Sequence, residues 1–353
     1  MIFKINGTEI SDLSPAYIIA EMSGNHNGDI NYAIEIIKKA KEAGADAVKL
    51  QTYKASTITL DSNKEDFLLP KDSPWAGSKN LYSLYEEAHT PWEWHKKLFK
   101  VAHEVGIDIF SSPFDETAVD LLESLNTPAY KIASPEINDL QLIKKVALTN
   151  KPIILSTGLA TVEDIELAIK TLEDNGCYQY AFLKCTTAYP APLDEINLAT
   201  IPEIRKRYNC IAGLSDHTLG IEVPIASVAL GAKIIEKHFT VDKSNTGVDS
   251  FFSLDFVEFK QMVSSIRKVE SAIGVANFDL TKSSKNNLRG KRSLYVSKNI
   301  KKGELLTPNN IKSVRPGLGL APKYFDSVLN KPVKRDLEFG ERLKLEDIDI
   351  DIE

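Results

Sequence analysis

Eight short apolar segments in this chain each end in a group of polar residues. They are 17–22, 47–53, 108–114, 129–134, 152–158, 180–186, 210–217 and 232–240. Between them, apolar residues recur at helical spacing, as in 30–43, which stops at Gly44, a residue favoured at helix ends. Parallel strands need crossovers of about a dozen residues, so this alternation predicts a parallel sheet. Eight repeats favour a (β/α)8 TIM barrel, an α/β fold, over an open doubly wound sheet.

Most crossovers carry a predicted helix. Helices are expected over 115–126, 137–149, 161–174, 221–230 and 254–273. Another is expected to start with Thr90 as N-cap, Pro91 at the first helical position and Glu93 in a capping box. The insertion 54–88, with a short helix near 79–88, is either a lid or a packing loop.

The composition changes after the last barrel helix. We expect a barrel domain over 1–280, a polar and basic linker over 281–292, and a small domain over 293–353. So small a domain buries little core, and we expect it to lean on a neighbour or a second subunit.

Composition excludes several classes of protein. Hydrophobic residues make up 43% and charged residues 26% of the 353 residues, as in ordinary globular proteins. The start, MIFKINGTEI, lacks the apolar core of a signal peptide, and no apolar run reaches a membrane span of about 18 residues. A cytoplasmic location is therefore expected. Three cysteines without CxxC spacing argue against a disulfide scaffold and a zinc site, so reduced thiols are expected. The net charge of −6 makes nucleic acid an unsuitable partner.

The polar residues at the strand ends are the candidate site, because active sites of such barrels lie at that rim. They include Glu21, Lys49, Gln51, Ser112, Lys131, Ser134, Glu136, Ser156, Tyr189, Ser215, His217 and His238. Lysines with Ser and Thr hydroxyls suit a phosphate or carboxylate. A Schiff-base aldolase that uses one of these lysines is the rival enzyme class.

Two histidines stand at equivalent ends of adjacent strands. His217 and His238 can hold one divalent ion while leaving positions for water and substrate, with Glu21, Glu136 and Asp249 as further candidates nearby. Imidazole and carboxylate ligands suit Mn²⁺, Co²⁺ or Fe²⁺ better than Ca²⁺. The other helical histidines, His89, His95 and His103, are expected on helix surfaces.

One arginine in the small domain is a further candidate binding residue. Arg315 lies in the Pro- and Gly-framed loop VRPGLGLAP, which can hold a guanidinium rigidly for bidentate recognition of a carboxylate or amide oxygen.

Taken in order, eight motifs resemble those of the sialic acid synthase family. They are AEMSGNHNG (20–28), VKLQT (48–52), YKIASPE (130–136), STG (156–158), KCTTAYP (184–190), GLSDHT (213–218), EKHFTVD (236–242) and RPGLG (315–319). The segments 81–95 and 247–255 resemble the pseudaminic acid synthase branch, with Ser250 where other branches carry histidine. Thr187 and the pair Asp255-Phe256 depart from the usual family pattern.

The resemblance implies a metal-dependent barrel joined to a C-terminal antifreeze-like (SAF) domain. It implies that phosphoenolpyruvate condenses with an N-acylated amino sugar and water, with Mn²⁺ as the expected ion and Mg²⁺ or Co²⁺ as alternatives. On this basis the phosphate and carboxylate of phosphoenolpyruvate bind Lys49, Lys131, Ser112, Ser134, Ser156 and Ser215.

The resemblance assigns further roles. His217 and His238 would bind the metal, and Glu136 would stabilise the charged centre or deprotonate the attacking water. Glu21 and Asp249 would contact sugar hydroxyls or metal-bound water. Gln51 and Tyr189 are expected substrate contacts.

The resemblance also implies a domain-swapped homodimer, in which Arg315 reaches the N-acyl group of a sugar bound by the other subunit. The expected sugar is 2,4-diacetamido-2,4,6-trideoxy-L-altrose. Phe251 and Phe252 form either an apolar wall for its methyl group or part of the core. A legionaminate or neuraminate synthase is the alternative within the family. A non-catalytic sugar-binding or ice-binding protein is the alternative outside it.

Overall fold

The structure is a computed structural model that describes residues 3–71, 73–244 and 247–349. It contains two compact units, Met1–Gly274 and Val275–Glu353. The predicted linker limits at 281 and 292 stay predictions.

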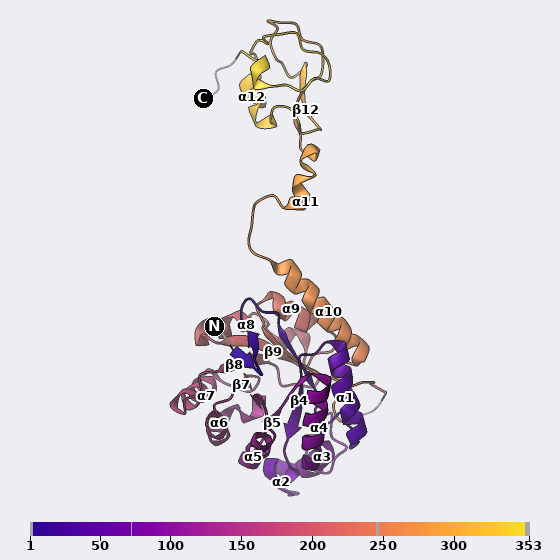
Figure 1. Ribbon diagram of the computed structural model, residues 1–353, viewed down its shortest axis with the longest axis vertical. Helices are drawn as coiled ribbons and strands as arrows, with labels where there is room; N and C mark the ends of the chain where they lie inside the picture. The colour runs from indigo at the N-terminus through magenta and orange to yellow at the C-terminus, as the bar shows by residue number, and fades with distance from the viewer. Residues whose placement is uncertain (1–2, 72, 245–246, 350–353) are drawn as a thin grey trace. The chain divides into compact units, whose positions relative to one another are not determined.

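The first unit is a closed barrel of eight parallel strands (Figure 1). Its strands are β3 Tyr17–Glu21, β4 Ala47–Thr52, β5 Asp108–Pro113, β6 Tyr130–Ile132, β7 Ile153–Ser156, β8 Tyr180–Cys185, β9 Ile211–Asp216 and β10 Ile234–His238. Each lies within one of the eight predicted segments, and β10 closes the barrel against β3. The predicted barrel fold is confirmed.

Helices surround the barrel. They are α1 Ile30–Ala43, α4 Trp92–Val105, α5 Glu116–Ser124, α6 Leu140–Ala147, α7 Val162–Asp174, α8 Thr200–Tyr208, α9 Glu222–Ala229 and α10 Phe256–Ile273. The sequence pattern does not predict α8, because Pro202 interrupts its short apolar pattern. A proline in the first turn removes no intrahelical hydrogen bond, so the helix still forms.

A hairpin covers the opposite end of the barrel from the strand C-termini. Its strands are β1 Phe3–Ile5 and β2 Thr8–Ile10, joined by Asn6-Gly7 with both residues at positive φ. Asn-Gly is the favoured pair for such a turn, so the sequence carries a signal for this hairpin, which is not among the predicted elements. Phe3, Ile5 and Ile10 are buried in one apolar cluster with the barrel interior.

Alternate residues along each strand point into the barrel, which divides its interior into two halves. The half beside the hairpin is apolar and consists of Tyr17, Ile19, Ala47, Phe110, Ala129, Ile154, Ala181, Leu183, Ile211 and Ile234. Two residues further along β3, β4 and β10, the same alternation gives Glu21, Lys49 and Glu236. The strand period therefore brings charged groups together at the C-terminal end.

The insertion after β4 forms α2 Ala55–Ile58, η1 Glu65–Phe67 and α3 Leu81–Ala88. Its start is fixed by His95, whose Nε2 lies 2.8 Å from the hydroxyl of Thr52. At its end, the hydroxyl of Thr90 lies 3.2 Å from Nε2 of His26. Both histidines are fully buried. The insertion is thus pinned at both ends.

Two expectations for this region are wrong. His95 does not lie on a helix surface, because its ring turns inward to meet Thr52. Thr90 is not the N-cap of α4, because its side chain is engaged with His26 and Pro91 takes that position instead.

The second unit has a small core of its own. β11 Ser293–Val296 and β12 Ile311–Val314 pair antiparallel, and the short helices α11 Lys282–Lys285 and α12 Phe325–Val328 complete its helical segments. Among the described residues, the further 3-10 turns are η2 Ser134–Asn138, η3 Leu193–Glu195, η4 Leu288–Gly290, η5 Pro322–Tyr324 and η6 Leu345–Asp347. The core consists of Leu294, Val296, Ile300, Leu306, Ile311, Val328, Val333, Leu337, Leu343 and Ile348.

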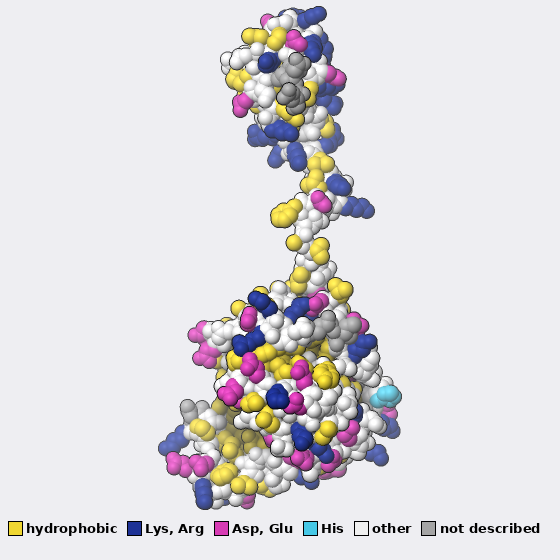
Figure 2. All heavy atoms as spheres, turned by 90° about the vertical axis from the view of Figure 1, so that its left-hand side faces the viewer, with side chains coloured by type: hydrophobic (Ala, Val, Ile, Leu, Met, Phe, Trp, Pro, Cys, Tyr) yellow, Lys and Arg dark blue, Asp and Glu magenta, His cyan; other side chains and the backbone are white. Residues whose placement is uncertain are grey.

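Charge differs between the two parts of the sequence. Residues 275–353 carry 16 Lys and Arg against 11 Asp and Glu, although the whole chain has a net charge of −6. Basic side chains are correspondingly frequent on the second unit (Figure 2). Among the described helices, none combines the length and apolarity that a membrane crossing requires.

Candidate active site

A cavity of about 360 Å³ lies at the C-terminal end of the barrel strands. Strand ends and adjacent loops supply Glu21, Ser23, Lys49, Gln51, Tyr53, Lys131, Ala133, Ser134, Pro135, Ser156, Cys185, Thr187, Tyr189, Ser215, His217, Glu236, His238, Val248 and Asp249. The insertion supplies Leu69, Ser73, Trp75, Leu81, Leu84, Tyr85 and Ala88. The charged and hydroxyl residues at the strand ends therefore form a polar floor. The residues of the insertion form a largely apolar wall.

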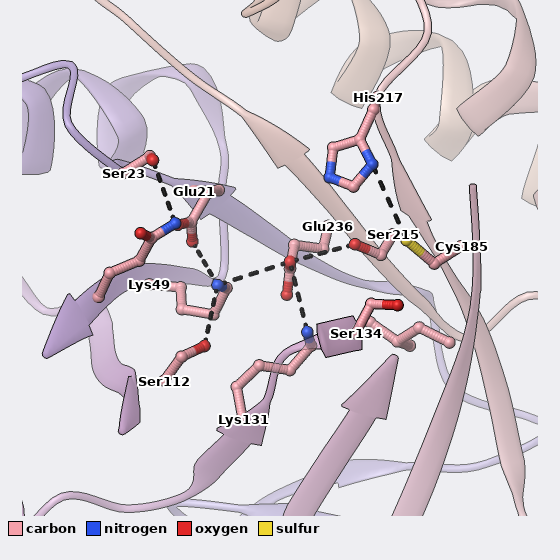
Figure 3. A network of polar contacts seen from close by, with 12 residues as sticks. Glu21, Ser23, Lys49, Ser112, Lys131, Ser134, Cys185, Ser215, His217 and Glu236 are labelled. Carbon is pink, nitrogen blue, oxygen red and sulfur yellow. Dashed lines mark hydrogen bonds and ion pairs between the residues drawn. The ribbon is translucent and has the colours of Figure 1, made fainter. Parts of the chain in front are cut away.

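A buried ionic network forms the floor (Figure 3). The Lys49 ammonium lies 2.7 Å from Glu21 and 3.6 Å from Glu236, and it donates to the Ser112 hydroxyl at 3.2 Å. The Lys131 ammonium lies 3.7 Å from the same oxygen of Glu236. Ser215 donates to that oxygen at 3.2 Å. Two cations and two anions thus occupy one floor with almost no exposed surface.

The pKa values follow from this arrangement. Burial opposes ionisation of Glu236, but the nearby Lys131 and Lys49 outweigh it and lower the pKa of this carboxyl group. Burial likewise opposes the charge of Lys49, but Glu21 and Glu236 raise the pKa of its ammonium group. For Lys131, which has one carboxylate close by, burial dominates and lowers the pKa. Lys131 is therefore the cation that gains most from an additional anion.

Hydroxyl groups line the same floor. The Ser134 hydroxyl accepts from the backbone N–H of Leu159 at 2.8 Å and from the hydroxyl of Thr187 at 3.0 Å. The Ser156 hydroxyl is buried without a hydrogen-bond partner among the described residues. Because an unsatisfied buried hydroxyl is costly, Ser156 fits a ligand oxygen in the cavity.

Next to the network, the two histidines face one another. The rings of His217 and His238 have centroids 5.3 Å apart. His217 Nδ1 lies 3.0 Å from the carbonyl of Thr186 and 3.8 Å from the Cys185 sulfur. His238 Nδ1 is buried, has no hydrogen-bond partner in the described chain, and lies 4.0 Å from Asp249. Burial holds the pKa of His238 well below its usual value, so its ring is neutral and suited to a metal.

Asp249 links the histidines to Ser23 and Gln51 in the same cavity. Its carboxylate accepts a short hydrogen bond from Ser23. Gln51 donates to Ser23 at 3.1 Å and to Glu21 at 3.0 Å. Gln51 therefore fixes the positions of both groups.

Glu136 lies just outside the lining. It belongs to η2 Ser134–Asn138, which follows β6. Burial raises the pKa of Glu136 to about 7, and one of its oxygens has no hydrogen-bond partner in the described part of the chain. A carboxyl group with this pKa can accept or donate a proton at neutral pH.

Eleven of the fourteen predicted site residues line this one cavity, and the other three do not. Ser112 lies beneath the lining and holds Lys49, while Glu136 adjoins the lining residue Pro135. Arg315 belongs to the second unit and is exposed.

The motif EKHFTVD begins at Glu236, but the sequence analysis assigns this residue no role. The signal was its position two residues before His238 on β10, which places both side chains inside the barrel. It also missed Ser23, Cys185 and the wall formed by the insertion. No local motif marks that wall, because its residues converge only in the folded chain.

The expected wall of Phe251 and Phe252 is wrong. Phe251 is 45% exposed, and neither phenylalanine is among the described lining residues. Phe252 is buried and packs its ring 4.6 Å from the ring of His238, so it supports the histidines from behind.

Known proteins share this architecture. The profile of the NeuB family matches residues 36–277, and that of the SAF domain matches residues 291–349. A pseudaminic acid synthase of Campylobacter jejuni is 46% identical over 94% of this chain and 96% of its own length. A pseudaminic acid synthase of Helicobacter pylori is 45% identical over 96% and 99%.

Other matches are more distant. An N,N'-diacetyllegionaminic acid synthase of Campylobacter jejuni is 37% identical over 93% of this chain and 98% of its own length. Among solved structures, a sialic acid synthetase of Leptospira borgpetersenii has a TM-score of 0.72 and 28% identity, over 82% of this chain and 95% of its own. The match over more than half of the chain, together with the barrel and its floor, confirms the predicted family: this chain belongs to the NeuB family.

Proposed function

We propose that this enzyme condenses phosphoenolpyruvate with 2,4-diacetamido-2,4,6-trideoxy-L-altrose and water, giving pseudaminic acid and phosphate. The observation that carries this proposal is the pair of buried lysines, Lys49 and Lys131, in one cavity with His217 and His238. The relatives named pseudaminic acid synthase, at 45–46% identity, support this sugar over the legionaminate precursor, whose synthase is 37% identical.

The floor supplies the groups that phosphoenolpyruvate needs. Lys131 and Lys49 provide positive charge for its phosphate and carboxylate, and Ser134, Ser156 and Ser215 provide hydroxyls around them. Ser112 acts from below by holding the Lys49 ammonium.

A divalent ion fits beside this floor. His238 Nδ1 is buried without a partner in the described structure, and His217 and Asp249 lie close to it. No cluster of three or more His, Cys, Asp or Glu suited to a metal occurs among the described residues, so water and substrate would complete the ligand set. When bound, Mn²⁺, or Mg²⁺ or Co²⁺ in its place, would polarise the sugar aldehyde and position the water.

The reaction balances with these groups. The π electrons of phosphoenolpyruvate form a bond from carbon three to the aldehyde carbon, which leaves a cationic carbon two. Water adds there and gives its proton to Glu136, whose pKa of about 7 permits this role. The aldehyde oxygen takes up a proton and becomes a hydroxyl. The bond from carbon two to the phosphate oxygen then breaks as the new hydroxyl at carbon two becomes the keto group, and its proton leaves with the inorganic phosphate. Glu21 and Asp249, held by Gln51 and Ser23, orient the sugar hydroxyls.

We also propose a domain-swapped homodimer in the cytoplasm. The basic second unit suits an acidic barrel, which supports docking on a partner subunit. Three buried, unpaired cysteines support a reducing compartment. Arg315 would then bind the N-acyl group of the sugar in the partner's cavity.

Arg315→Ala is expected to raise the KM for the sugar about tenfold and leave the KM for phosphoenolpyruvate unchanged. Equal effects on both constants would contradict this role.

The proposed reaction is tested by phosphate release from phosphoenolpyruvate with Mn²⁺. The altrose sugar is compared with the legionaminate precursor and N-acetylmannosamine. Release with the altrose sugar at a much higher kcat/KM is expected, and preference for another sugar would overturn the substrate. Trapping of the chain by borohydride with an aldehyde substrate would instead indicate a Schiff-base aldolase, whose lysine needs the lowered pKa that Lys131 has.

A further inference from the structure

We propose that the insertion between β4 and α4 selects the sugar through an apolar wall that contacts carbon six of the open chain. This inference rests on the proposed function. The wall is defined by Leu69, Trp75, Leu81, Leu84, Tyr85 and Ala88.

The wall faces a floor of opposite character. Every ionisable lining group that belongs to a barrel strand, such as Glu21, Lys49 and Lys131, lies on the floor. Among the six wall residues, only Tyr85 and Trp75 carry a hydrogen-bonding side-chain group, a hydroxyl and an indole N–H. The insertion adds the hydroxyl of Ser73 beside the wall. That indole N–H is already satisfied, because it donates to the carbonyl of Val248 at 3.0 Å. A hydroxyl brought against Leu69, Leu81 or Leu84 would lose water without gaining an equivalent partner.

The geometry of the reaction decides which part of the sugar meets the wall. The aldehyde carbon must approach carbon three of phosphoenolpyruvate on the floor, near His217 and His238. Carbon six stands at the other end of the open chain, so it is the end directed away from the floor. A methyl group at carbon six is matched to the wall, whereas a hydroxymethyl group is not.

The wall is held in a fixed position, which selectivity requires. Trp75 packs its ring against Tyr189, with centroids 5.4 Å apart. Ala88 and Val248 approach Gly24 so closely that a Cβ there would lie 2.7 Å from a Val248 methyl and 3.2 Å from the Ala88 carbonyl. The His95–Thr52 and His26–Thr90 contacts hold the ends of the insertion. The wall is thus anchored by contacts with the barrel and with the loop that carries Asp249.

The insertion offers a matched pair of variants. Leu69 lines the cavity, whereas its neighbour Leu68 is 44% exposed and does not line it. Leu69→Gln places a polar group in the wall, and Leu68→Gln makes the same chemical change outside it. Leu81→Gln, at the first residue of α3, tests the wall at a second position.

The experiment measures phosphate release with the trideoxy sugar and with its analogue that carries a hydroxyl at carbon six. We expect the wild-type protein to favour the methyl sugar about 10- to 100-fold in kcat/KM. Leu69→Gln and Leu81→Gln should lower this ratio about tenfold with an unchanged KM for phosphoenolpyruvate. Leu68→Gln should keep the ratio of the wild type.

Each result has a defined meaning. A wild-type protein that uses both sugars equally, or folded Leu69→Gln and Leu81→Gln proteins with the wild-type ratio, would overturn the wall while leaving the condensation intact. No phosphate release with either sugar would instead overturn the proposed function, and the wall with it. Circular dichroism identifies a variant that has not folded, and the other wall variant then decides.

Discussion

The same eight strands build two different halves of the barrel interior. Beside the β1–β2 hairpin, the interior is a close-packed apolar cluster that includes Ile5, Phe110 and Ile234. Two residues further along β10, the interior holds Glu236, which shares one oxygen between Lys49 and Lys131. Burial alone therefore does not define a core. The first half contributes stability by removing apolar surface from water, and the second spends stability to keep charges where a substrate can use them.

The largest expected effect is a loss of activity from a substitution in the charged half of the barrel interior. Lys131→Met replaces the ammonium with an apolar group of similar length and leaves Glu236 with Lys49 as its remaining cation. We expect phosphate release to fall about 10²- to 10³-fold, as when a preorganised donor is removed from an active site. Steady-state kinetics with saturating phosphoenolpyruvate measures the loss. Activity within threefold of the wild type would show that the cation of Lys131 is not needed.

The second prediction is a loss of stability from a substitution in the apolar half of the barrel interior. Ile5 is completely buried in the apolar cluster and belongs to the hairpin at the far end of the barrel. Ile5→Ala should lower the free energy of unfolding by about 3 kcal/mol because it removes packed methyl groups and leaves a cavity. Urea unfolding measures this change, and kcat at 20 °C should stay within twofold. A loss of kcat without a loss of stability would contradict the division between the halves.

A smaller effect comes from the histidines that pin the insertion beside the charged half. Burial lowers the pKa values of His26 and His95 from 6.5 to about 4. As the pH falls, these histidines are therefore protonated in the unfolded chain before they are protonated in the folded protein. Their contribution to the free energy of unfolding is fully present above pH 6.5 and is lost as the pH falls towards 4. At pH 5 the expected loss is about 2 kcal/mol for each histidine relative to pH 7.5.

Unfolding at the two pH values tests this, with His95→Asn as the variant. His103→Asn is the control, because His103 is exposed near the end of α4. His95→Asn should reduce the stability difference between the two pH values, and His103→Asn should not. An equal reduction in both variants would assign the effect to other groups.

The sequence predicts the fold to different degrees in different regions. All eight barrel strands are recognisable because each buried strand is a short apolar run with polar residues at one end, and helices between them follow the 3.6-residue period. The helix α8 is not predicted, because Pro202 interrupts its short pattern of apolar residues. The burial of His95 is not predicted either. The helical period identifies the apolar face of a helix but not a polar side chain that turns inward, as His95 does to contact Thr52.

The candidate site follows the same rule. Residues on the strands, such as Lys49 and His238, are predictable because strand order and alternation place them at one rim. The wall is not predictable, because Leu69 and Trp75 come from an irregular insertion whose path depends on contacts with Val248 and Tyr189. Phe251 and Phe252 have the right chemistry for a wall, yet one faces outward and the other packs behind His238.

The shared oxygen of Glu236 has a consequence for how an anion enters. The floor carries its own counter-ion, so an incoming phosphate does not meet a bare positive site but competes with the Glu236 carboxylate for the ammonium groups of Lys49 and Lys131. Because Lys49, Lys131 and Glu236 are buried and their charges are already paired, binding should respond weakly to added salt. Phosphoenolpyruvate affinity should therefore change less between 50 and 500 mM KCl than the affinity of an anion held by surface lysines.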